Sequence, residues 1–323
     1  MNAAAAAPAL AHPRLAGLIE QAAAQAAANG LPRLGIVHAC DPLALHAADR
    51  IATARLAEPV LIGARTLIER AADAAGVDAR RFEIIDTAEA AAAAARRAAE
   101  LARDAVLSAL MKGSLHTDEL IGAIVHKSAG LRLATRISHT FVFDLPRYHK
   151  LLALADCVIN IRPHVLAKRD ILGNAIGLLR HLGINAPKVA IVAAVETVRP
   201  AIEATVEAQA LVDLAQRGHW PGAIVEGPFG FDNAISAEAA RIKQMDRRVS
   251  GDPDLLLVPD LNAGNMLYKS FSYIGGGDCA GLVLGAKVPI ALTSRADSLQ
   301  SRVASVALAV LSLNEPALAA AGA

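Results

Sequence analysis

Short runs of Val, Ile and Leu alternate along this chain with alanine-rich segments of helical length, and no other feature limits the possible folds as strongly. Short branched apolar runs between turn residues are typical of buried strands, and alanine favours helices. Strands that alternate with helices predict a parallel sheet with helices on both faces. In the first third, the predicted strands are residues 34–39, 59–62, 82–85 and 105–111, and the predicted helices are 15–28, 66–75 and 87–104.

The pattern changes near Gly130 and indicates a second domain. Residues 136–143 alternate in polarity, which is typical of an edge or antiparallel strand. A last helix, predicted at 299–313, should return to the first domain. We therefore predict a doubly wound α/β fold with residues 1–136 and 294–323 in one domain and 137–293 in the other, as suits a chain of 323 residues. Later strands are predicted at 155–161, 188–193, 223–225, 255–258, 280–284 and 289–292.

Composition argues against several classes of protein. A net charge of +1 gives no surface for nucleic acid, and no apolar run is long enough to span a membrane. The three cysteines lack the spacing of metal ligands or of a disulfide framework, and no basic segment marks a signal peptide, so we expect a cytoplasmic protein. The chain has no GxGxxG after its first strand and no P-loop, so a classical nucleotide-binding domain is not supported.

Polar residues gather where the strands predicted at 255–258 and 289–292 end. Ligands of open α/β sheets bind beyond the carboxyl ends of strands, so these residues form a candidate site. Their types favour an anion, because a guanidinium matches phosphate and a neighbouring hydroxyl can donate to a reacting thiol or an oxyanion. An alternative is that Thr293 or Ser294 only caps a helix. The first group is Asp260, Asn262, Gly264, Asn265 and Lys269, and the second is Ser294, Arg295 and Asp297.

A second candidate cluster follows the strand predicted at 105–111. Gly113 and Ser114 could present backbone amides at a helix N-terminus, Lys112 adds charge, and His116 could transfer protons. The alternative is that Thr117 or Asp118 is an ordinary helix cap.

Six stretches of the chain, in order, are similar to the phosphate acetyltransferase / phosphate butyryltransferase family. The forms SRAD and EGPFGFDNAIS resemble its butyryl-like branch, and SLHTDEL resembles the acetyltransferase domain of bifunctional enoyl-CoA hydratase/phosphate acetyltransferase enzymes. The stretches are LMKGSLHTDEL (110–120), SHTFVFDLP (138–146), PKVAIVAAVETVRP (187–200), GAIVEGPFGFDNAIS (222–236), DLLLVPDLNAGNMLYK (254–269) and PIALTSRADS (289–298).

The resemblance implies the reaction acyl-CoA + phosphate = acyl phosphate + CoA, with an acetyl or butyryl group and direct attack in a ternary complex. It also implies an isocitrate/isopropylmalate dehydrogenase-like fold with an interdomain cleft, a homodimer, and no required cofactor or metal. By resemblance, Ser294 contacts the CoA sulfur or the oxyanion, and Arg295 holds the phosphate. The loop 113–117 resembles the GAxHTT loop of the acetyl enzymes. That branch has a carboxylate where this chain has Ser301, so Asp297 is our candidate base; its alternative roles are a salt bridge to Arg295 or a helix cap.

Two other functions stay open at this point. One is a metal- and NAD-dependent hydroxyacid dehydrogenase of the same fold, which would need clustered aspartates. Asp252, Asp254 and Asp260 are close in sequence, but the strand at 255–258 separates the first two from the third. The other is a protein that binds CoA or acyl phosphate without catalysis, which the serine at position 301 would favour.

Overall fold

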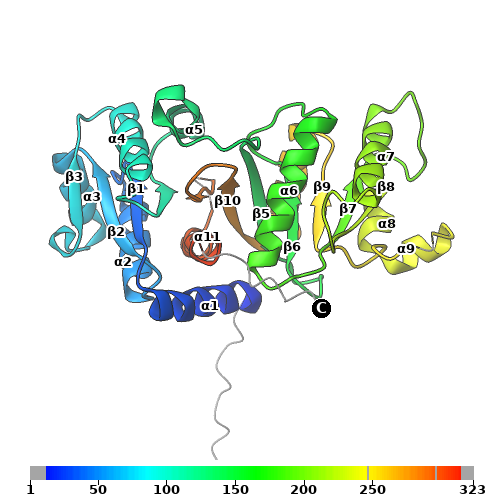
Figure 1. Ribbon diagram of the computed structural model, residues 1–323. Coiled ribbons are helices and arrows are strands. Elements are labelled where there is room, and N and C mark those ends of the chain that lie inside the picture. Colours follow the sequence, from blue (N-terminus) through cyan, green and yellow to red (C-terminus); the bar gives the residue numbers. More distant parts are fainter. Residues whose placement is uncertain (1–11, 246, 295–296, 314–323) are drawn as a thin grey trace, which may run out of the picture.

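The computed structural model describes residues 12–245, 247–294 and 297–313, and in this part the strands form one mixed sheet (Figure 1). Across the sheet the order is β3 (Glu83–Asp86), β2 (Glu58–Gly63), β1 (Arg33–Val37), β4 (Ala109–Lys112), β11 (Ile290–Ala291), β10 (Asp278–Leu284), β5 (Ser138–Asp144), β6 (Leu152–Ala155), β9 (Leu255–Leu257), β7 (Lys188–Val192) and β8 (Ile224–Phe229). The helices are α1 (Pro13–Asn29), α2 (Pro42–Thr53), α3 (Arg65–Ala75), α4 (Ala91–Arg103), α5 (Thr117–Val125), α6 (Val165–His181), α7 (Glu203–Gln216), α8 (Phe231–Ile235), α9 (Ala237–Ile242), α10 (Leu261–Tyr273) and α11 (Leu299–Leu311), with short 3-10 turns at Ala79–Arg81 and Lys127–Ala129.

The sheet consists of two parallel groups of strands that run in opposite directions. Strands β3, β2, β1, β4 and β11 are parallel, and so are β6, β9, β7 and β8. Between the groups, β11 pairs with β10, β10 with β5 and β5 with β6, and all three pairings are antiparallel. The predicted α/β class with a mostly parallel sheet is confirmed, but three reversals separate its halves.

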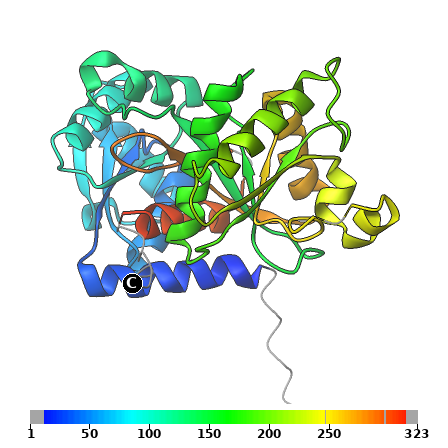
Figure 2. The ribbon, with the colours of Figure 1, turned by 45° about the vertical axis from the view of Figure 1, so that its right-hand side comes forward.

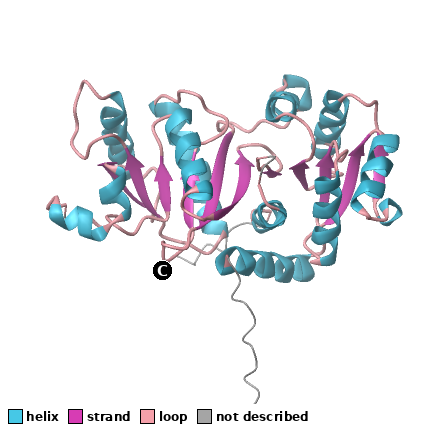
Figure 3. Cartoon of the chain, turned by 180° about the vertical axis from the view of Figure 1, so that it is seen from behind, coloured by secondary structure: helices cyan, strands magenta, loops and turns pink. Residues whose placement is uncertain are grey.

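Helices cover both faces of the sheet, as Figures 2 and 3 show. One apolar cluster runs along a whole face, from α2 and α3 past α1 and α11 to α6. The opposite face carries two clusters, one beneath α4 and α5 and one beneath α10. None of the helices in the described ranges is both long and apolar enough to cross a membrane.

Two strand predictions need correction. The run at 136–143 is antiparallel as predicted, but all seven residues of β5 are buried, so it is a central strand and not an edge. The strand predicted at 155–161 lies instead at Leu152–Ala155. The carboxylate of Asp156 accepts the N–H groups of Val158 and Ile159 at 2.9 and 3.0 Å, and this folds the chain into a turn where the apolar pattern predicted a strand.

Candidate active site

Two of the predicted polar clusters, the loop 112–117 and the segment that starts at Ser294, follow strands of the first parallel group and lie at the same edge of the sheet. Strand β11 lies beside β4 in parallel register, with Ala291 opposite Met111. Lys112 ends β4, and Ser294 follows β11 by three residues. Because parallel neighbours end at the same edge, the loop 112–117 and the segment after β11 emerge side by side, although they are far apart in sequence.

The loop after β4 folds tightly onto the end of β1. The Gly113 and Ser114 N–H groups donate to the Val37 and His38 carbonyls at 2.9 and 3.0 Å, so the prediction that these two amides are presented to an anion is wrong. A Cβ at position 113 would lie 2.5 Å from the same two carbonyl oxygens. The Ser114 hydroxyl donates to the His38 carbonyl at 2.9 Å and lies 3.0 Å from Nδ1 of the same residue. Sequence reasoning missed His38 as part of this site, because its left-handed backbone (φ 55°) and its contact with Ser114 have no sequence signature.

The other residues of the loop differ in exposure. Lys112 is buried and His116 is exposed. Helix α5 begins at Thr117, with His116 at the N-cap position, and the Glu119 carboxylate accepts the His116 N–H at 2.9 Å. The alternative in which Thr117 or Asp118 caps this helix is therefore wrong, because both residues lie inside its first turn.

The segment after β11 is held by a carboxylate and a tyrosine. One Asp297 oxygen accepts the Ser294 N–H at 2.7 Å, and the other accepts the Tyr268 hydroxyl at 2.7 Å. The Tyr268 ring stacks on Phe141 of β5, with 4.3 Å between ring centroids. Arg295 lies outside the described residues. Ser298 caps α11 through the Ser301 N–H, so the alternative in which Thr293 or Ser294 caps that helix is wrong.

The surroundings of Asp297 change the pKa of its carboxyl group. Burial raises the pKa of this carboxyl, and the donated bonds from Tyr268 and Ser294 oppose that rise. Burial and the neighbouring Asp297 raise the pKa of the Tyr268 phenol, so this residue stays a hydrogen-bond donor. A carboxylate whose pKa is raised is a stronger proton acceptor than an ordinary carboxylate.

Ser301, the position of the acetyl-branch carboxylate, already meets a carboxylate. Its side chain is fully buried and its hydroxyl donates to Asp278 on β10. The Ser298 hydroxyl donates to the same carboxylate at 2.8 Å. Asp278 therefore occupies the space next to position 301.

The cluster that follows β9 lies on α10 and does not share the edge of β4 and β11, since β9 runs the other way. Asp260 is the N-cap of α10 and accepts the Ala263 N–H at 2.9 Å. Asn262 and Lys269 are exposed, and Asn265 donates to the Cys157 carbonyl at 3.5 Å. A Cβ on Gly264 would lie 2.7 Å from the Asp156 carbonyl oxygen, so α10 packs closely here. The helix still links the two regions, because Tyr268 lies eight residues after Asp260, or about 12 Å along the axis.

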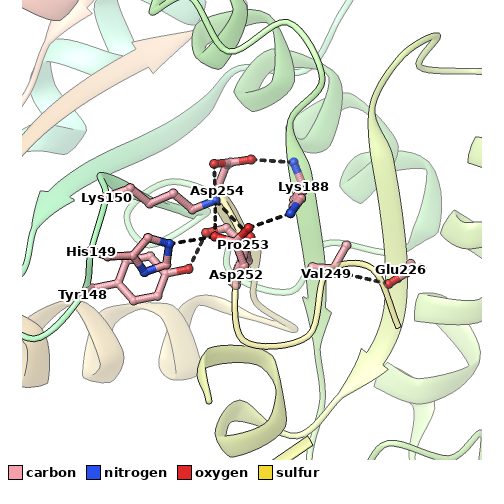
Figure 4. A network of polar contacts seen from close by, with 9 residues as sticks. All are labelled: Tyr148, His149, Lys150, Lys188, Glu226, Val249, Asp252, Pro253 and Asp254. Carbon is pink, nitrogen blue, oxygen red and sulfur yellow. Dashed lines mark hydrogen bonds and ion pairs between the residues drawn. The ribbon is translucent and has the colours of Figure 1, made fainter. Parts of the chain in front are cut away.

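Asp252 and Asp254 lie at the start of β9, and lysines neutralise them (Figure 4). Lys150 contacts both carboxylates at 2.7 Å, and Lys188 contacts Asp252 at 2.6 Å. Asp260 is at the other end of the strand. Among the described residues, no three His, Cys, Asp or Glu side chains are grouped as a metal site would need. This arrangement does not favour the metal-dependent dehydrogenase.

Comparison with known proteins agrees with the resemblance found in the sequence. A protein-family model described as "Phosphate acetyl/butaryl transferase" matches residues 89–310, more than two thirds of the chain. A phosphate acetyltransferase of Rhizobium meliloti is 48% identical over 276 residues, which is 85% of this chain and 87% of that protein. A probable phosphate butyryltransferase of Bacillus subtilis is 46% identical over 64% of this chain and 69% of its own length. The crystal structure of a branched-chain phosphotransacylase from Enterococcus faecalis superimposes with a TM-score of 0.77 at 26% identity, covering 88% of this chain and all of that one.

Proposed function

Because the chain belongs to the phosphate acetyl/butyryl transferase family, we propose that Ser294, Arg295 and Asp297 carry the chemistry of acyl transfer and that the loop 112–117 faces them across the substrate. The chain is a phosphate acyltransferase, which catalyses acyl-CoA + phosphate = acyl phosphate + CoA. The observation that most supports the proposed site is the parallel pairing of β4 with β11, which puts both segments at one edge of the sheet. Both segments would then form one wall of the cleft, on the first predicted domain (residues 1–136 with 294–323), and the second predicted domain (residues 137–293) would form the other wall.

The proposed mechanism is a direct attack without a covalent enzyme intermediate. In the direction of acyl-CoA formation, the CoA sulfur attacks the carbonyl carbon of the acyl phosphate, and the carbon–oxygen bond to phosphate then breaks. Asp297 takes the thiol proton, a role that its raised pKa supports. The Ser294 hydroxyl donates to the developing oxyanion, and Arg295 holds the departing phosphate. In reverse, a phosphate oxygen attacks the thioester and Asp297 returns the proton to sulfur.

The substrate-binding part of the proposal uses the polar residues around this centre. The N–H groups of Gly113 and Ser114 already donate to the Val37 and His38 carbonyls, so the donors of this loop are the N–H groups at the start of α5, where a helix N-terminus favours anions. Asn262, Asn265 and Lys269 recur at helical spacing along one side of α10. We assign that side of α10 to CoA, together with Asp260 at its start, and the loop 112–117 with His116 and Thr117 to the phosphorylated end of the substrate.

A homodimer is also part of the proposal. The C-terminal end of α10 exposes Tyr273 and Ile274 to 72% and 87%. These two residues lie beyond Lys269, at the end of the helix away from Asp260, and exposed apolar groups of this kind mark protein interfaces. We therefore expect sedimentation to show two copies of the chain, and Ile274→Lys to weaken their association.

The activity assay follows CoA release from acetyl-CoA and butyryl-CoA. Release should require inorganic phosphate, and equal release without phosphate would contradict a phosphate acyltransferase. Ser294→Ala and Arg295→Ala should each lose about 3 kcal/mol of transition-state stabilisation, or roughly a hundredfold in kcat. Ser270→Ala is the control, since that exposed hydroxyl only donates to the Met266 carbonyl within α10. Full turnover by the Arg295 variant would remove that residue from the mechanism.

A further inference from the structure

Arg302, in the first turn of α11, is a buried cation, and no carboxylate among the described residues forms an ion pair with it. It is 4% exposed, and its Nε is buried without an acceptor. Within the described ranges, no carboxylate oxygen lies within 4.0 Å of its guanidinium, whereas ten other arginines there, none of them buried, have such a partner. Guanidinium groups are seldom buried unless they are paired, so this arrangement needs an explanation.

The surroundings of Arg302 place it beneath the proposed active site. Two carboxylates, Asp41 and Asp297, attract its charge from beyond ion-pair distance. Asp41 follows β1 and Asp297 follows β11, and only β4 lies between these two parallel strands. Both carboxylates have other partners, since Asp41 accepts the Ala44 N–H at 2.7 Å and Asp297 accepts from Tyr268 and Ser294. Arg302 therefore lies at the edge where the loop 112–117 and Ser294 emerge, and its neighbours leave its charge available.

A second buried cation in the same chain shows the contrast. Lys168 of α6 is also 4% exposed, but its ammonium group forms an ion pair with Glu207 of α7. Burial lowers the pKa of Arg302, which reflects the free energy needed to keep an unpaired charge away from water. Proteins keep unfavourable arrangements of this kind at functional sites. A bound anion would pair with the buried charge and offset the free energy of burying it.

We propose that Arg302 is a second guanidinium for the phosphoryl group, which binds between Arg302 and the segment that carries Ser294. The inference rests on the proposed function and deepens it: a dianion in the acyl-phosphate position contacts Arg302 from the first turn of α11, in addition to the role that the proposed function gives Arg295. Forked guanidinium donors match phosphate oxygens, so two of them fix both the charge and the orientation of the leaving group.

The test combines heat stability with kinetics in Arg302→Met, which keeps the length of the side chain without its charge. If Arg302 serves phosphate, the variant without ligand should melt at the same temperature as the unchanged protein or higher, because an unpaired buried charge is gone. Inorganic phosphate should raise the melting temperature of the unchanged protein but not of the variant. The KM for phosphate should rise at least tenfold, while the KM for acyl-CoA changes less than threefold. Arg302→Lys should recover part of the phosphate response.

Lys168→Met is the matched control. It should melt at a lower temperature, because the largely buried carboxylate of Glu207 is left unpaired, and it should keep the phosphate response. The inference is overturned if Arg302→Met melts lower yet keeps the phosphate response and the phosphate KM, or if its kinetic defect falls on acyl-CoA. The melting experiment needs no turnover, so it judges Arg302 even if the exchange assay disproves the proposed function.

Discussion

Removing the hydroxyl of Tyr268 tests whether Asp297 acts in its ionised form. Tyr268→Phe keeps the ring that stacks on Phe141 and deletes the donor that lies 2.7 Å from Asp297. The carboxylate would then keep only the Ser294 N–H from the two donors described here. A hydrogen bond to a charged group stabilises by about 1.5–3 kcal/mol, so the ionised form of Asp297 should lose about that much.

The expected effect on catalysis is a change in pH dependence. Since burial already raises the pKa of Asp297, the loss of a donor raises it further, and the acidic limb of the kcat/KM profile should move to higher pH. On that limb, kcat/KM should fall by about ten- to a hundredfold, because 1.4 kcal/mol corresponds to a factor of ten. At alkaline pH, where Asp297 is ionised in both proteins, the difference should be small.

Stability should respond to pH with a definite sign. An acid whose pKa is higher in the folded state binds more protons there, so folding stability decreases as pH rises from its unfolded value through its folded value. The further rise in Tyr268→Phe therefore gives a stability deficit that is largest above the raised pKa and disappears at low pH. Denaturant melts at a series of pH values measure this difference.

Tyr148→Phe is the matched control for Tyr268→Phe. Tyr148 is also buried, but its hydroxyl donates to a neutral acceptor, the Pro253 carbonyl, at 2.7 Å in the network of Figure 4. Its loss should cost about 1 kcal/mol of stability and leave the rate profile unchanged. If Tyr268→Phe also retains the acidic limb of the unchanged enzyme, ionised Asp297 is not the base and only holds the Ser294 segment in place.

Two further substitutions test the neighbouring carboxylates. Ser301→Asp introduces the carboxylate that the acetyl branch has at this position. It should lower the free energy of unfolding by about 2–4 kcal/mol at pH 8 relative to Ser301→Asn, because the Asp278 carboxylate already lies next to position 301. Faster turnover by the Asp variant would show that position 301 can still hold a base. In the network of Figure 4, partial burial acts to raise the pKa of Asp252, but hydrogen bonds from Lys150, Lys188 and His149 outweigh it and hold the pKa well below its usual range. Asp252→Asn should therefore lower the free energy of unfolding by about 1 kcal/mol at neutral pH, a value reduced because the Asp252 side chain is 37% exposed. This deficit should shrink as pH falls below about 4, where Asp252 takes up a proton in the unfolded chain, and the stabilising ion pairs are lost when the folded protein takes up that proton as well. A deficit that stays constant in acid would contradict the ion-pair account.

Local patterns predicted much of this fold because each depends on a few neighbouring residues. Branched runs gave most of the strands, and the alanine-rich segments gave helices α1, α3 and α4. The prediction failed where a side chain redirected the backbone, as Asp156 does at the end of β6. Helix α10 was not predicted, because the polar residues of 260–269 indicated a ligand site and concealed the cap at Asp260.

The sequence located the site only in part. The rule that ligands bind beyond the carboxyl ends of strands identifies one edge of the sheet only when all the strands are parallel. Both β9 and β11 are followed by polar residues, but the reversals at β10 and β5 send their carboxyl ends in opposite directions. What joins the two clusters is α10, which carries Tyr268 to Asp297, a contact between residues 29 positions apart. The role of Arg302 was equally hidden: a charge in the first turn of a helix is typical of the surface, but α11 is buried on all sides from Ser301 to Leu311. A buried helix has no outward face on which to place a charge, so the presence of an arginine there is itself the reason to look for an anion.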